Sequence, residues 1–142
     1  MIKLFYCCLL ALPLRHLSLT SGYGFRVHPV TGQLCFHSGI DLRARHDTVF
    51  AVMQGRIAFV GYNRVTGVYI RLASGDFILL YGHLSQVFVL PGDYVNSCTP
   101  LGITGSSGRV TGEHLHFSVS YKQAPVNPLY FLRGLMNNQL TN

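Results

Sequence analysis

Four histidines and one aspartate, gathered in three short glycine-bounded motifs, are the residues whose types and spacing could do chemistry. In the last motif, His114 and His116 are separated by one residue. On a β-strand, residues i and i+2 project from the same face about 6.5–7 Å apart. Both imidazoles would therefore lie over one site, while Leu115 would point to the opposite face. For such a pair taken alone, two solvated surface histidines are the alternative.

The first motif, His37-Ser38-Gly39-Ile40-Asp41, adds an imidazole and a carboxylate four positions apart. Fully extended, four residues would span about 13 Å. We expect Gly39 to let the chain bend between them, because glycine tolerates backbone angles that other residues avoid. A histidine, a carboxylate and a second histidine at about 2.0–2.2 Å make a zinc site with one position open for water or substrate, as in catalytic zinc sites.

The middle motif places His83 after Tyr81-Gly82, at the end of an apolar run where a turn begins. A polar residue there is commonly just a loop residue, so His83 alone carries little information. Together, however, the three motifs hold four of the seven histidines and one of the five acidic residues. This concentration indicates one shared site.

Short strands separated by turn residues must position these motifs. Val68–Leu72 and Phe77–Tyr81 flank Ala73-Ser74-Gly75-Asp76, a strong hairpin signal, and Thr31-Gly32 suits a second hairpin. His114–Tyr121 alternates strictly between polar and apolar residues. Strands at intervals of roughly 8–12 residues predict an all-β fold, mainly an antiparallel sheet, in an open, sandwich or barrel-like arrangement. Little helix is expected beyond a short one after Pro128 that runs through Met136.

The composition predicts one domain. The chain has 142 residues, of which 49% are apolar and only 11% charged, so a disordered chain is excluded. We divide it into an apolar N-terminal segment, 1–19, and a domain, 20–142. After Lys3, the run Leu4–Leu12 is too short for the ~20 residues of a membrane span. It resembles the core of an export signal, which could also serve as an anchor; the alternative is the first element of the fold.

The formal net charge of +6 suggests a polyanionic partner: nucleic acid, anionic lipid or bacterial cell wall. The arginines are scattered and form no basic run, so we expect no nucleic-acid partner, and a basic nucleic-acid-binding β-barrel is a minor alternative. The cysteines form no CxxC pair, which argues against a zinc ribbon. The alternatives are a Cys35–Cys98 disulfide in an exported domain and two buried free thiols.

The three motifs resemble those of the M23 family of zinc metallopeptidases, the lysostaphin/LytM type, which cleave peptidoglycan peptides. The resemblance covers roughly Thr20 to Phe131 and includes Ser21–Arg26, His37–Leu42, Tyr81–Ser85, Gly105–Gly108 and Thr111–Phe117, in the family's order. It implies a compact antiparallel β architecture with the site in a groove lined by loops. It also implies that His37, Asp41 and His116 bind one Zn²⁺ per chain, and that His83 and His114 are catalytic residues beside the metal.

The resemblance implies an exported zinc-dependent endopeptidase of the cell envelope that hydrolyses peptide cross-links or stem peptides of bacterial peptidoglycan. The alternative is a catalytically inactive module of the same fold that binds the wall and activates another hydrolase; all five chemical positions are filled, which favours the enzyme. Arg45–Thr48 and Ser97–Pro100 depart from the family pattern and bear on loop shape and substrate preference. Glu113 should point away from the histidine pair on its strand, so we interpret it as structural.

Overall fold

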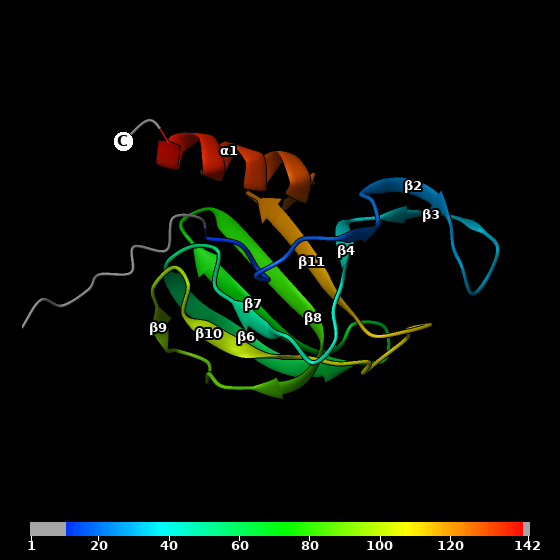
Figure 1. The fold of residues 1–142 in the computed structure, drawn as a ribbon, viewed down its shortest axis with the longest axis horizontal. Helices are drawn as coiled ribbons and strands as arrows, with labels where there is room; N and C mark the ends of the chain where they lie inside the picture. The colour runs from blue at the N-terminus through cyan, green and yellow to red at the C-terminus, as the bar shows by residue number, and fades with distance from the viewer. Residues whose placement is uncertain (1–10, 141–142) are drawn as a thin grey trace, which may run out of the picture.

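The structure, a computed structural model, describes residues 11–140. Strands dominate, and a helix follows them at the C-terminal end (Figure 1). The elements are β1 (Leu19–Ser21), β2 (Gly24–Val27), β3 (Leu34–His37), β4 (Gly39–Arg43), β5 (Thr48–Phe50), β6 (Gly55–Asn63), β7 (Gly67–Ser74), β8 (Phe77–Val87), β9 (Tyr94–Val95), β10 (Pro100–Thr104), β11 (His114–Tyr121), β12 (Ala124–Val126) and α1 (Pro128–Leu140). The predicted all-β fold with little helix is confirmed.

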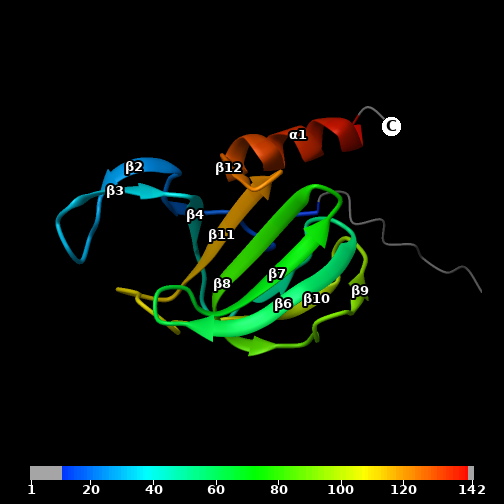
Figure 2. The same ribbon diagram turned by 180° about the vertical axis from the view of Figure 1, so that it is seen from behind.

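A large antiparallel sheet forms the body of the domain. Its main path runs β1-β4-β11-β8-β7-β6-β9; β10 pairs with both β5 and β8, and β12 extends the sheet beside β11. The strands β2 and β3 form a separate two-stranded sheet. Figures 1 and 2 show this hairpin standing out from one end of the body, with α1 lying along another side. The three motifs meet because β4, β11 and β8 are neighbours in the sheet.

The core lies under the apolar faces of these strands. On β11, Leu115, Phe117 and Val119 are almost completely buried, whereas the intervening residues stay partly exposed, as the alternation predicts. The hydroxyl of Tyr81, fully buried on β8, accepts a hydrogen bond of 3.0 Å from the backbone N–H of Val52. This bond ties the loop after β5 to the centre of the sheet.

Several element boundaries differ from the prediction. The hairpins at Gly75 and at Thr31-Gly32 form as expected, and α1 continues four residues past Met136. The strand predicted to end at Tyr81 runs on to Val87. Its last part pairs with β10, in which Thr104 is opposite Leu84 and Gly102 is opposite Val87. A partner so distant in sequence left no signal in the local pattern.

Residues 11–18 pack against the domain. Leu14 is buried in the core, the carbonyl of Pro13 accepts a bond from the N–H of Phe50, and the carbonyl of Ser18 accepts one from Arg43. Most of the predicted export segment, Leu4–Leu12, lies outside the described residues. Among those described, no helix combines the length and apolar character that crossing a membrane requires.

Both expectations for the cysteines are wrong. Cys35 is a free, half-buried cysteine on β3, and Cys98 is disulfide-bonded. The two therefore neither pair with each other nor remain as two free thiols. The physical reason is distance: β3 belongs to the projecting hairpin, whereas Cys98 lies in the turn between β9 and β10, at the far end of the molecule (Figure 1).

Candidate metal centre

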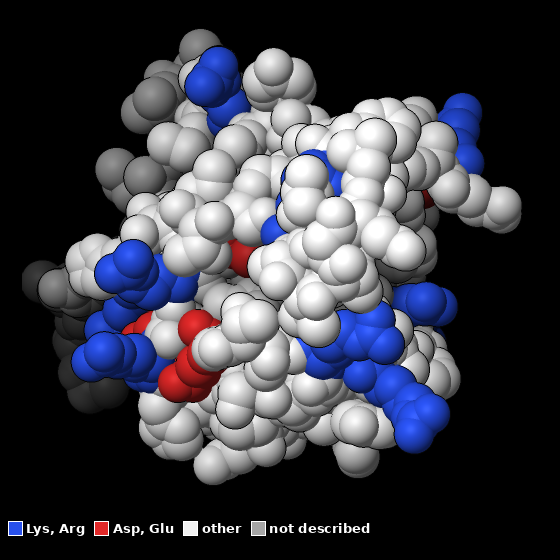
Figure 3. Space-filling view, turned by 90° about the vertical axis from the view of Figure 1, so that its right-hand side faces the viewer, with Lys and Arg blue, Asp and Glu red and all other residues white. Residues whose placement is uncertain are grey.

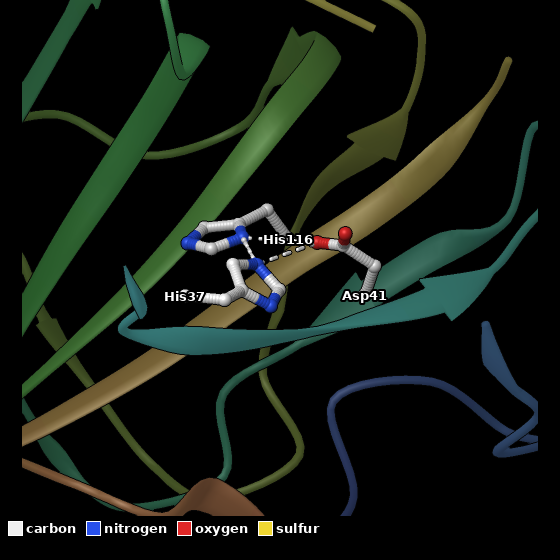
Figure 4. Close-up of side chains that lie close together, drawn as sticks. All are labelled: His37, Asp41 and His116. Atoms are coloured by element: carbon white, nitrogen blue, oxygen red, sulfur yellow. Dashed lines mark hydrogen bonds and ion pairs between the residues drawn. The ribbon is translucent and has the colours of Figure 1, made fainter. Parts of the chain in front are cut away.

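Side chains from β3, β4 and β11 converge on one point. In the sheet, His116 of β11 is directly opposite Asp41 of β4, so both side chains project from the same face. His37 ends β3, a single residue separates it from the start of β4, and the chain folds its ring back over this pair. Figure 4 shows the three side chains pointing toward one another. The structure brings together all three ligands that the resemblance implies.

The distances between the facing atoms suit a tetrahedral ion. His37 Nε2 lies 3.2 Å from His116 Nδ1 and 3.3 Å from Asp41 Oδ1. His116 Nδ1 lies 3.0 Å from the same carboxylate oxygen. Ligands about 2.0–2.1 Å from a tetrahedral zinc ion lie about 3.3 Å from one another. Two imidazoles and one carboxylate are also a donor set that zinc accepts in catalytic sites. The residues present therefore fit the ion.

Outer contacts orient these ligands. His37 donates its Nδ1 proton to the carbonyl of Gly22 at 2.8 Å, so the lone pair of Nε2 faces the site. On the other side, Arg26 Nη2 lies 3.7 Å from Asp41 Oδ2, the oxygen that faces away from the histidines. Arg26 Nη1 also donates to the hydroxyl of Ser21 on β1. Sequence reasoning did not identify Arg26, although it stands in one of the matching motifs.

Gly39 is required for space rather than for an unusual backbone angle. Its φ is not among the positive values of the chain, contrary to our expectation. A Cβ at this position would lie 2.6 Å from the carbonyl oxygen of Phe117 and 2.7 Å from the ring of His116. The imidazole of His116 therefore occupies the volume that any larger residue would need.

The carboxylate is held in its charged form. Burial by itself would raise the pKa of Asp41, but hydrogen bonds from His116 and His37, together with their positive charge when protonated, outweigh it. The net effect places the pKa of Asp41 far below its usual range. A carboxylate that stays ionised can act as a metal ligand at any pH at which the protein functions.

The other two predicted residues, His83 and His114, stand beside this cluster. The ring centroids of His83 and His114 are 4.6 Å apart, and that of His83 is 6.0 Å from the ring of His116. His114 Nε2 lies 3.6 Å from Asp41 Oδ1. His114 Nδ1 donates to the carbonyl of Gly112 at 2.9 Å. Neither of these two histidines belongs to the group of atoms that could share one ion.

His83 is buried and strained, which distinguishes it from an ordinary loop residue. Its φ of 61° lies in the left-handed region, which non-glycine residues seldom adopt. Burial lowers the pKa of His83 to about 4, although a bond from its Nδ1 to the carbonyl of Ser107 at 2.7 Å acts in the opposite direction. At neutral pH the ring is therefore uncharged, with its proton on Nδ1 and a lone pair on Nε2.

Ser107 is a supporting residue whose role sequence reasoning missed, although the motif Gly105–Gly108 marked its position. Its carbonyl accepts the hydrogen bond from His83 Nδ1, and its hydroxyl accepts a bond from the N–H of Val68 and donates one to the carbonyl of Leu84. A Cβ on Gly67 would lie 2.3 Å from the carbonyl oxygen of Ser107. The start of β7 therefore lies close against the loop between β10 and β11, and this contact fixes the carbonyl that orients His83.

Glu113 takes no part in the cluster. Its carboxylate accepts bonds from the N–H of His46 and from the hydroxyl of Thr104. Glu113 therefore braces the loop between β4 and β5, in agreement with its interpretation as structural.

An open groove of about 700 Å³ gives access to the site. Its lining includes all five residues together with parts of the β2–β3 hairpin and of the loop before β11. Figure 3 shows this end of the molecule, where Lys and Arg atoms gather in several groups, with a small acidic area near the centre and a larger acidic area beside the left-hand groups. The arrangement can admit an extended chain to a metal ion flanked by two imidazoles.

Comparison with known proteins identifies the family to which the chain belongs. The model of "Peptidase family M23" matches residues 35–128. The DD-carboxypeptidase/endopeptidase Mpg of Neisseria meningitidis is 38% identical over 120 residues, 82% of this chain and 27% of the relative. The peptidoglycan DD-endopeptidase ShyC of Vibrio cholerae is 36% identical over 105 residues, 72% of this chain and 24% of the relative.

Solved structures agree in fold. The catalytic domain of lysostaphin from Staphylococcus simulans superimposes with a TM-score of 0.75 at 30% identity, covering 82% of this chain and 92% of that one. A zinc-containing peptidase from Vibrio cholerae gives 0.76 at 30% identity, covering 83% of this chain and 38% of that one.

Fold and site together define a β-sheet metallopeptidase domain. The chain belongs to peptidase family M23. It spans about a quarter of the length of the two curated relatives above.

Proposed function

We propose that this protein is a zinc-dependent endopeptidase that hydrolyses peptide cross-links or stem peptides of bacterial peptidoglycan. The observation that supports it best is the set of facing ligand atoms 3.0–3.3 Å apart, next to two further imidazoles, at the floor of an open groove. The names of the relatives, peptidoglycan DD-endopeptidases among them, indicate the substrate class.

We assign one Zn²⁺ per chain to His37 Nε2, Asp41 Oδ1 and His116 Nδ1. When bound, zinc polarises a peptide carbonyl and lowers the pKa of a bound water toward ~7. The chain's own part is to hold the three donors at tetrahedral spacing and to keep the fourth direction open toward the groove. The bond from His37 to Gly22 and the contact of Arg26 with Asp41 maintain this geometry.

His83 and His114 are the groups that would move protons. Because the Nδ1 of each ring donates to a backbone carbonyl, each has its Nε2 available. His83 is uncharged at neutral pH, so its Nε2 can accept a proton from the attacking water. His114 lies closer to the carboxylate, 3.6 Å from Asp41 Oδ1, and a protonated ring there would stabilise negative charge on the substrate or protonate the leaving amine.

Peptidoglycan as substrate implies action in the cell envelope, so we propose that the protein is exported to the periplasm or the cell exterior. We retain the division into an export or anchor segment, 1–19, and a peptidase domain, 20–142, as part of this proposal. Because residues 11–18 pack on the domain, the described part of the segment is expected to remain with it after export. Mass spectrometry of the mature protein tests this division.

Digestion of purified peptidoglycan, followed by mass spectrometry of the released fragments, tests the activity. We expect new peptide ends with the zinc-loaded protein, and none in the presence of a chelator or with the Asp41→Ala variant. Wall that is bound but not cleaved by zinc-loaded protein would instead identify the chain as an inactive wall-binding module.

A further inference from the structure

A second cavity, of about 560 Å³, lies outside the groove. Two segments form it, residues 14–18 and residues 43–50. Leu14 and Ala44 are buried apolar residues of its lining. Around them the cavity carries three arginines and two histidines against a single acidic residue; these are Arg15, Arg43, Arg45, His16, His46 and Asp47.

The arginines of this cavity are not neutralised within the described part of the chain. All the ion pairs found there involve Asp41, and none involves Arg15, Arg43 or Arg45. The single carboxylate of the cavity, on Asp47, accepts a bond from the backbone N–H of Arg45 instead. Guanidinium groups of like charge repel each other when they gather without a counter-ion. The arrangement favours the binding of an anion.

The walls of the cavity are fixed before any ligand binds. The N–H of Arg43 donates to the carbonyl of Ser18 at 2.8 Å, and the N–H of Phe50 donates to that of Pro13 at 3.0 Å, so the two segments are joined at both ends. The loop between β4 and β5, which belongs to the second segment, is braced by Glu113, whose carboxylate accepts a hydrogen bond from the N–H of His46 at 2.8 Å. A rigid frame reduces the entropy cost of binding.

The cavity neighbours the groove. Arg43 follows Asp41 by two residues on β4, which places both on the same face of the strand, and in the sheet it is opposite His114. A peptide bound over the zinc site therefore has the cavity two residues, about 6.5–7 Å, further along β4. The loop Arg45–Thr48 supplies part of the wall.

We propose that this cavity is an anion-binding subsite that takes a carboxylate of the same peptidoglycan strand whose peptide bond lies at the metal centre. The inference rests on the proposed function. Guanidinium groups recognise oxyanions by paired hydrogen bonds, and a carboxylate offers two oxygens in the matching plane. Continuity with the groove favours an acidic group on the substrate itself over a separate anion.

Sedimentation of the zinc-loaded full chain with insoluble peptidoglycan, on ice and at low salt, tests the proposal. The test variant is Arg15→Gln combined with Arg45→Gln; Arg43 is left intact because it neighbours His114. A matched control removes two exposed charges elsewhere, Arg56→Gln combined with Arg133→Gln. Each protein is mixed with untreated wall and with wall whose carboxylates have been converted to amides.

The test variant should bind untreated wall roughly tenfold more weakly than the unmutated chain, and the control should match the unmutated chain. Amidation of the wall should weaken binding of the unmutated chain to the level seen for the test variant on untreated wall. Equal binding by test variant and control overturns the proposal, and so does undiminished binding to amidated wall. If inorganic phosphate displaces the unmutated chain while amidation has no effect, the ligand is a phosphate and the carboxylate assignment is wrong.

Two further measurements separate the causes of failure. Zinc content and thermal unfolding establish that the test variant is folded; if it is not, the single change Arg45→Gln replaces it, with about half the effect on the free energy of binding expected. Release of wall fragments by the unmutated chain tests the proposed function on its own. If the unmutated chain cleaves the wall but its binding does not depend on these arginines, the proposed function stands and the subsite proposal is wrong.

Discussion

Backbone carbonyls fix the direction of three of the four clustered imidazoles. Each of these rings donates its Nδ1 proton to a carbonyl outside the cluster, so its Nε2 is left for the site. The pairs are His37 with Gly22, His83 with Ser107, and His114 with Gly112. The fourth ring, on His116, turns Nδ1 itself toward the carboxylate. The proposed difference between ligand and proton carrier is therefore one of position, since all four side chains are chemically the same.

Removal of a ligand and removal of a proton carrier should have different effects. We expect Asp41→Ala and His116→Ala to lose zinc, because each removes one of the three donors. We expect His83→Ala to keep zinc and to lose turnover by roughly 10²- to 10⁴-fold, the usual contribution of a general base. Zinc per chain and cleavage of purified wall, measured on the same preparations, check this. A His116→Ala protein with full zinc occupancy would refute the ligand assignment.

Arg26 should act on zinc affinity through Asp41. Its guanidinium lies 3.7 Å from Asp41 Oδ2 and has a buried Nε with no hydrogen-bond partner among the described residues. We expect Arg26→Gln to weaken zinc binding roughly 10- to 100-fold, as is typical when an outer contact of a ligand is lost. Competition with a coloured chelator measures this. The matched control is Arg109→Gln, which lines the same groove without contacting the ligands; equal losses in both variants would contradict the role of Arg26.

The link between β3 and β4 is the element on which the metal centre depends most. A single residue, Ser38, separates the strand that carries His37 from the strand that carries Asp41. This short link turns the ring of His37 back toward its neighbour. At the same point β4 lies against β11, with Gly39 opposite Ser118, so closely that a Cβ on Gly39 would lie 2.7 Å from the ring of His116.

Gly39→Ala should disturb the metal site more than the strand. Its added Cβ would lie 2.7 Å from the His116 ring and 2.6 Å from the carbonyl of Phe117, and the ring can move more easily than the backbone. We expect a loss of zinc affinity together with a lower melting temperature, measured by chelator competition and thermal unfolding. Gly134→Ala, on the helix with nothing near its added Cβ, is the control. Unchanged zinc affinity in Gly39→Ala would show that the contact is not tight.

Local pattern was sufficient to predict most of the strands, and the family resemblance selected five residues that the structure brings together, whose roles stay predictions. The alternation of His114–Tyr121 and the turn at Gly75 leave clear signals because they depend on neighbours in sequence. The contacts of Arg26 with Asp41 and of Ser107 with His83 could not be predicted, since they join segments 15 and 24 residues apart through geometry that only the folded sheet creates. The extension of β8 likewise depends on a partner distant in sequence, β10.

At the scale of the whole molecule, buried titratable groups make stability depend on pH. His83 has its pKa lowered to about 4 by burial, against 6.5 for an ordinary histidine. Between these values the unfolded chain binds a proton at this residue that the folded chain does not. The contribution of His83 therefore makes the protein less stable as the pH falls from 6.5 toward 4, and has no effect on the pH dependence above that window.

Comparison of the unmutated chain with His83→Gln tests this dependence. Because glutamine does not titrate, the variant lacks the loss of folding stability that His83 causes at low pH. We expect the variant to gain stability relative to the unmutated chain as the pH falls from 6.5 to 4.5. Chemical unfolding at several pH values, with zinc content monitored, measures the difference. A difference in unfolding free energy that is constant over this range would contradict the lowered pKa.

The free cysteine of the projecting hairpin makes the groove observable. Cys35 lines the same groove as the metal centre, and within residues 11–140 it is the free cysteine while Cys98 is already oxidised. Within the described part of the chain, a thiol-reactive dye should thus mark one side of the groove without any engineered residue. Its emission would then follow a wall fragment arriving and leaving in real time.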